Sequence, residues 1–105
     1  MYRIAALYEP GSDQYNEVIE TAANVYPADT EANLNAASVA LRQADITRAG
    51  SYLKRAGQTP AAINARGVLA LLQGHLAQAQ QLFEQAAANG SDEAKRNLAL
   101  ITAAN

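Results

Sequence analysis

Cysteine and tryptophan are absent from this 105-residue chain, and there is a single histidine, His75. Without cysteine, disulfide frameworks, thiolate zinc sites and cysteine nucleophiles are excluded, and one imidazole cannot form a histidine metal cluster. Three prolines and few β-branched residues argue against an all-β fold. No run reaches the roughly 18 apolar residues that a membrane helix needs, so we expect no membrane insertion.

Basic residues are also scarce. The chain contains eight Lys and Arg and ten Asp and Glu, which gives a net charge of −2. A nucleic-acid binder needs a basic stripe that displaces phosphate counterions. We therefore expect no nucleic-acid partner. The charges are uneven, with a net −5 over residues 1–31 and +4 over residues 32–83. Such an asymmetry either orients a partner or forms ordinary solvated faces.

Alanine is abundant instead. It supplies 25 of the residues behind the 50% hydrophobic content, so the larger apolar groups are few. Alanine is the best helix former, and its small side chain lets helices approach closely. The length fits one domain that folds without staples, with much of its buried surface coming from close contact of small residues.

Small residues recur along the chain at helical spacing. One pattern reads Ala32-x-x-Asn35-x-Ala37, Ala62-x-x-Ala65-x-Gly67 and Ala94-x-x-Asn97-x-Ala99, with offsets of 30 and 32 residues. A second pattern, Ala49-x-x-x-Leu53-x-x-Ala56, returns 30 residues later as Ala79-x-x-x-Phe83-x-x-Ala86. Spacings of three and four place each set on one helical face, so the repeating unit is a helix–turn–helix.

Capping and stop signals set the expected helices. Thr59-Pro60 is a strong start, and Asn89-Gly90 favours a left-handed helix end. The expected helices cover residues 2–8, 13–26, 30–43, 45–57, 59–73, 76–89 and 92–103. The predicted fold is all-α, an α–α superhelix of antiparallel helix–turn–helix repeats with about seven helices. One domain, 1–105, would contain units 1–27, 28–58 and 59–90 and a terminal helix at 91–105.

Helix crossings explain the small residues, because two helices 8–10 Å apart cannot both carry large side chains there. We expect Gly67 to face Ala79 within one pair, and Phe83 to fill the gap toward the adjacent pair. Gly67→Leu should then cost on the order of 1–3 kcal/mol or more through overpacking.

The block Gly67, Ala79, Phe83 and Ala86 resembles the tetratricopeptide (TPR) repeat, in which small residues at the crossing precede Ala, an aromatic and Ala. The stretch from Phe83 to Gly90, followed by Ala94, Asn97 and Leu98, is similar to Sel1-like repeats. The resemblance covers about residues 13–104. It implies a helical scaffold for protein or peptide partners.

The resemblance also implies a concave groove lined by the first helix of each pair. The polar residues that this face places in the groove could grip a peptide backbone or a carboxylate. They are Asn35, Arg42, Asn64, Arg96 and Asn97. The alternatives are ordinary polar helix surface, or asparagines that bridge adjacent helices.

A second candidate surface lies on the expected opening helix, which has no covering neighbour. It comprises Tyr2, Ile4, Leu7 and Tyr8. Tyrosines are enriched at protein interfaces, so this helix is a candidate for attachment to a larger parent chain or for homo-oligomer formation. The alternative is that the first pair uses tyrosine where the later pairs use leucine and phenylalanine.

No catalytic, cofactor or metal constellation is evident. Phosphate loops, serine elbows and paired catalytic carboxylates are missing, and Glu17 with Glu20 is read as solvated surface. We therefore expect a non-catalytic protein-interaction scaffold. The alternatives are a structural tail or docking domain of a larger cell-envelope or surface-assembly protein, and a fragment of an enzyme. The expected compartment is cytoplasmic if the chain is complete, and periplasmic or surface-associated if it is an excised domain.

Overall fold

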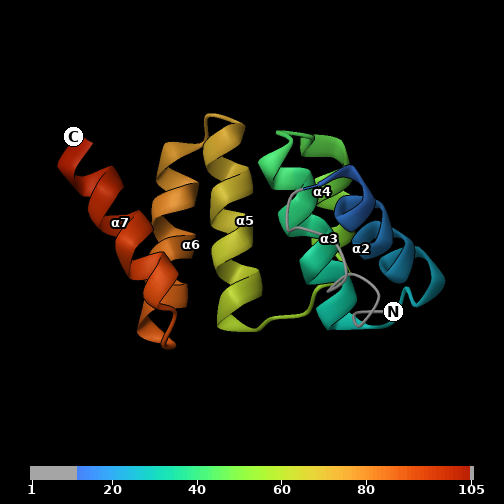
Figure 1. The fold of residues 1–105 in the computed structure, drawn as a ribbon. Coiled ribbons are helices and arrows are strands. Elements are labelled where there is room, and N and C mark those ends of the chain that lie inside the picture. Colours follow the sequence, from blue (N-terminus) through green and yellow to red (C-terminus); the bar gives the residue numbers. More distant parts are fainter. Residues whose placement is uncertain (1–11, 105) are drawn as a thin grey trace. The chain divides into compact units, whose positions relative to one another are not determined.

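The computed structural model describes residues 12–104, and in this part of the chain every regular element is an α-helix. The helices are α2 (Asp13–Val25), α3 (Thr30–Arg42), α4 (Ile46–Leu53), α5 (Pro60–Leu72), α6 (Leu76–Ala88) and α7 (Asp92–Ala104) (Figure 1). The prediction of an all-α chain is confirmed. The helix expected at residues 2–8 lies outside the described residues.

The chain divides into two compact units, Met1–Gly57 and Gln58–Asn105. In the first unit α3 packs against α2 and α4, and in the second α6 packs against α5 and α7. Within each unit, helices that follow one another in the chain therefore form antiparallel neighbours, as their short connections predict.

Five of the six helices begin with a side chain that caps the helix. Each cap oxygen accepts a hydrogen bond from the backbone N–H three residues later, which satisfies one of the unpaired donors of the first turn. The caps are Ser12, Asp29, Asp45, Thr59 and Ser91, with distances of 3.1–3.2 Å. His75, at the start of α6, makes no such bond. The start that the sequence predicts at Thr59 is thus confirmed.

Helices α3, α5 and α6 end in the same way. A residue with positive φ follows each helix, and the next N–H bonds back to the carbonyl five residues earlier, at 2.9–3.0 Å. The residues with positive φ are Ala44 (φ 56°), Gly74 (φ 81°) and Gly90 (φ 104°). Ala44 is the exception among them, because a residue with a Cβ atom is disfavoured in this conformation.

Helix α4 is shorter than predicted, because it ends at Leu53 rather than near Gly57. The backbone bonds of the residues after Leu53 change from the four-residue to the three-residue pattern. Arg55 N–H donates to Tyr52 O at 3.0 Å, and Ala56 N–H donates to Leu53 O at 3.2 Å. The tightened turn then leads to Gly57, whose φ of 79° prevents further helix.

The core of the first unit consists mostly of small side chains. Val39 and Asn33 are its largest fully buried residues. Asn33 Nδ2 donates to Pro27 O at 3.0 Å and to Asp29 O at 2.9 Å, so a buried amide holds the turn between α2 and α3. The other buried apolar residues of this unit include Ile19, Ala22, Ala23, Ala36, Ala37, Ala40, Ala49 and Leu53.

Phe83 forms the centre of the core of the second unit. It is fully buried in a cluster drawn from α5, α6 and α7, with Ile63, Ala70, Ala79, Ala86, Ala94 and Ile101. A Cβ atom built on Gly67 would lie 2.5 Å from Phe83 Cε1 and 2.7 Å from its Cδ1. The residue spacing predicts that Gly67 faces Ala79. In the structure the group nearest to Gly67 is instead the Phe83 ring. The glycine makes room for an aromatic side chain from its own helix pair.

Candidate functional site

The predicted groove residues are distributed over both units. Asn35 and Arg42 lie on α3 in the first unit, where Asn35 is half-buried and Arg42 is exposed. They are seven residues apart, about two helical turns, so both lie on one face of α3. The other three candidates, Asn64, Arg96 and Asn97, belong to the second unit, on α5 and α7.

Asn64 and Asn97 meet in the second unit. Asn97 Nδ2 donates to Asn64 Oδ1 at 3.0 Å, and Asn64 Nδ2 donates to Glu93 Oε2 at 3.5 Å. Asn64 is only 6% exposed, so these bonds satisfy an amide that would otherwise be costly to bury. For these two asparagines the structure contains a bridge between helices, which is one of the alternatives that the sequence leaves open.

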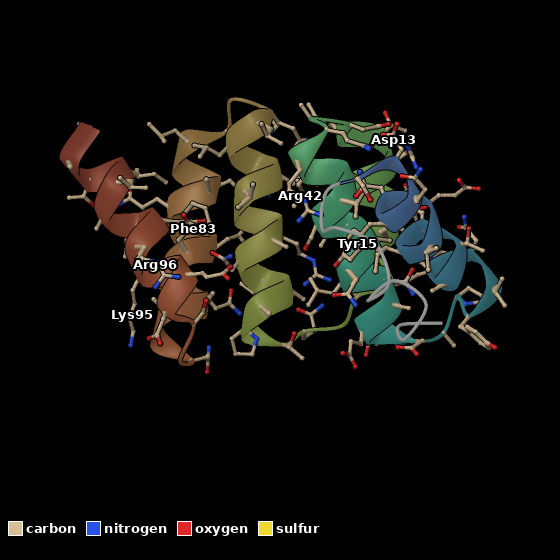
Figure 2. All side chains as sticks on the ribbon, viewed as in Figure 1. Asp13, Tyr15, Arg42, Phe83, Lys95 and Arg96 are labelled. Carbon is tan, nitrogen blue, oxygen red and sulfur yellow. The ribbon has the colours of Figure 1, made fainter. Side chains whose placement is uncertain are left out.

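An exposed rim lies next to this bridge on α7. Arg96 is exposed, and Leu100 is 69% exposed, the largest value among the large apolar side chains of residues 12–104. The two residues are four apart and therefore neighbours on the helix surface. Among the described residues Arg96 has no ion-pair partner. Its side chain, labelled in Figure 2, is thus available to a carboxylate.

Helix α5 continues the surface with apolar side chains. Val68 and Leu72 follow Asn64 at intervals of four residues, and Leu72 is 42% exposed. We call this combined surface the α5–α7 face. It consists of Asn64, Val68, Leu72, Glu93, Arg96, Asn97 and Leu100. A part-buried amide bridge thus lies beside apolar and cationic side chains that reach solvent.

Glu20 is not the solvated surface residue that the sequence suggests. Its side chain is 13% exposed and accepts hydrogen bonds from Arg48, with which it forms an ion pair, and from Tyr52 Oη at 3.3 Å. Tyr52 is itself buried, and the Arg55 guanidinium lies 5.8 Å from the centre of its ring. These contacts join α2 to α4. The only sequence signal was the acidic beginning followed by a basic middle.

A shallow surface depression on α7 was also not predicted. Its lining is mostly apolar and comes from residues spaced by three and four along the helix. We call this surface the α7 seam. It consists of Lys95, Leu98, Ala99, Thr102 and Ala103. The sequence signal for this surface was the repeat of small residues that ends at Ala99. That repeat does not indicate which side of α7 is exposed.

The candidate docking surface of Tyr2, Ile4, Leu7 and Tyr8 lies outside the described residues. Within residues 12–104 no three His, Cys, Asp or Glu side chains gather in a way that could hold a metal ion. No helix in this range combines the length and the apolar character needed to cross a membrane.

Comparisons of this chain with protein-family models, with curated proteins and with solved structures found no match.

Proposed function

We propose that this chain is a non-catalytic protein-interaction domain whose helix pairs form a TPR-like α–α superhelix, and that it binds a peptide on the α5–α7 face. The observation that carries the proposal is the 69% exposed Leu100 beside the exposed Arg96. Arginine is enriched in the cores of protein interfaces, and the exposed apolar surface of Leu100 beside it is area that a partner would remove from water.

The chemistry of the face favours a particular class of peptide. Leu100 and Leu72 offer apolar contact, and the Arg96 guanidinium offers bidentate hydrogen bonds to a carboxylate. The amides of Asn64 and Asn97 are bonded to each other, so they act as a rigid floor rather than as free ligand-binding groups. We therefore propose a ligand in which an acidic residue, or a terminal carboxylate, lies close to a large apolar side chain.

The proposal can be tested by selecting peptides from a random library displayed on phage, with the full chain as bait. We expect the selected peptides to share an acidic residue near an apolar one. Their affinity should fall by about tenfold or more in Arg96→Glu and in Leu100→Glu, because each change removes one of the two anchors.

Lys54→Glu is the matched control, since it makes the same charge reversal at an exposed position of the first unit. The selected peptides should bind this variant as they bind the wild type. A selection without enrichment, or peptides that bind all four proteins equally, would show that the α5–α7 face is not the binding surface.

A further inference from the structure

Asn89 is the only asparagine of this chain that is followed by glycine. Asparagine is thermally labile, because the backbone nitrogen of the next residue can attack its side-chain carbonyl carbon, Cγ. Glycine has no Cβ atom that would obstruct this attack. The pair Asn89-Gly90 lies where α6 ends and the turn to α7 begins. The chain thus places its most reactive asparagine at a helix end.

Solvent reaches both reacting residues. Asn89 and Gly90 are exposed, and a Cβ atom built on Gly90 would have no heavy atom within 4 Å. Asn64 and Asn97 lie instead within helices, are followed by larger residues, and are bonded to each other. Asn89 therefore differs from the other asparagines of the second unit both in its neighbour and in its access to water.

The turn holds both reacting groups through hydrogen bonds. Asn89 Nδ2, the group that would leave, donates to Gln85 O at 2.8 Å. The Gly90 N–H, the group that would attack, donates to Ala87 O at 3.1 Å. The nitrogen cannot attack Cγ until this bond opens. Hydrogen bonds of the last turn of an exposed helix end open at a low free-energy cost, so the reaction is slowed but not prevented.

We propose that Asn89 is a site of spontaneous deamidation in the folded protein, that opening of the last turn of α6 controls its rate, and that the products weaken the α6–α7 turn. The Gly90 nitrogen gives up its proton and bonds to Asn89 Cγ, while the Cγ–Nδ2 bond breaks and Nδ2 takes up a proton and leaves as ammonia. Water then opens the resulting succinimide ring. Cleavage of the bond to Cγ gives aspartate, and cleavage of the bond to the backbone carbonyl carbon gives isoaspartate.

Both products change the contacts of this turn. An ionised aspartate has no N–H to donate to Gln85 O, and its charge lies beside helix-end carbonyls that are themselves partly negative. Isoaspartate lengthens the backbone just before Gly90 and displaces Ser91, whose side chain caps α7 by accepting from the Ala94 N–H at 3.1 Å. The modification therefore acts on the start of α7, and it does not depend on the peptide surface proposed above.

Ageing the full chain at mildly alkaline pH tests the reaction. Trypsin releases a peptide of residues 67–95, in which Asn89 is the only asparagine, and mass spectrometry measures its conversion. We expect the folded chain to convert about tenfold more slowly than the chain in urea. Asn89→Gln is the control, because its longer side chain disfavours the ring closure, and its peptide should stay unmodified. A folded chain that does not convert while the chain in urea does, or equal rates in both, would overturn the proposal.

Two alanine substitutions at opposite ends of α6 test the control by its last turn. Ala88→Gly weakens this turn at an exposed position and should raise the rate by up to about fivefold. Ala77→Gly makes the same change in the exposed first turn and should leave the rate unchanged. Equal acceleration by both variants would show that the reaction needs unfolding of more than the turn. That result, or no acceleration by Ala88→Gly, would overturn the proposed control.

The effect of the product on the turn is measured with Asn89→Asp, which reproduces the aspartate form. Its thermal midpoint should fall by about 2–5 °C, because one hydrogen bond is lost and a charge is added at the wrong end of the helix. Asn89→Ala loses the bond without the charge and should fall less. An unchanged midpoint in Asn89→Asp would overturn the claim that the modification weakens the turn.

Discussion

At Gly67 a single hydrogen atom in place of a methyl group decides how α5 and α6 pack. The residue is buried, and the Phe83 ring occupies the space that a side chain would need. Glycine is otherwise unfavourable in the interior of a helix by roughly 0.5–1 kcal/mol relative to alanine. The molecule accepts this cost at a position where close approach lets its only phenylalanine enter the core.

We predict that Gly67→Ala destabilises the protein by about 1–2 kcal/mol. Overpacking costs roughly 1–3 kcal/mol, and the better helix propensity of alanine offsets part of it. The measurement is the urea midpoint at constant slope. In the double variant Gly67→Ala/Phe83→Leu the loss should be smaller than the sum of the single losses, because the clash is gone. A midpoint that rises in Gly67→Ala alone would show that the ring moves aside without cost.

Two turns of the chain show how local signals specify helix ends. In the α3–α4 turn the Asp45 side chain caps α4, but Ala44 has a positive φ. In the α5–α6 turn Gly74 has the positive φ, but His75 at the cap position makes no capping hydrogen bond. The residues correspond at an offset of 30. Each turn therefore contains the favourable residue that the other lacks.

We predict that exchanging the weaker residue in each turn raises stability. Ala44→Gly should gain up to about 1 kcal/mol, because it removes the left-handed strain but adds glycine entropy in the unfolded chain. His75→Asp should gain about 1 kcal/mol through a new cap for α6. The thermal midpoint reports both, and the effects should add because the variants lie in different units.

The reverse substitutions are the matched controls. Gly74→Ala and Asp45→His should lower the thermal midpoint by comparable amounts, since they introduce the same strain and remove the same cap. If Gly74→Ala left stability unchanged, positive φ would not limit these turns, and the account of Ala44 would be wrong.

The core of each of the two compact units consists mostly of alanine, with few large apolar side chains. The cluster around Phe83 draws its residues from α5, α6 and α7, and Ile19 is buried in the first unit. Alanine contributes little surface per residue, so each unit depends on a few large side chains. Truncating one of these large side chains should therefore lower the local stability mainly of the unit that contains it.

We predict that Phe83→Leu lowers amide protection mainly in the three helices α5, α6 and α7, by about fivefold for a loss near 1 kcal/mol, because Phe83 lies in the core cluster that these helices form. Native-state hydrogen exchange followed by NMR measures this. Ile19→Val is the matched change in the first unit and should affect mainly α2–α4. Equal loss of protection in both units for both variants would mean that the chain opens only as a whole.

The sequence alone determined where the described helices begin and end. Caps such as Thr59 and terminators such as Gly74 act through bonds that span at most five residues, so their effect can be read locally. It also indicated most of the small residues that are buried, because helical spacing places them on one face, but it was wrong for Ala99, which is exposed. Only α4 deviates, where a three-residue hydrogen-bonding pattern follows Leu53.

Only the tertiary structure decided which side chains meet across helices. Glu20 and Arg48 are 28 residues apart and Asn64 and Asn97 are 33 apart, and nothing local in the sequence selects these pairs. The register of one helix against another depends on how all its side chains fit at once, as with Gly67 and Phe83. The start and end of each helix follow from hydrogen bonds between residues close in the chain. The part-buried amide bridge and the exposed α7 seam follow from the packing of one helix against another.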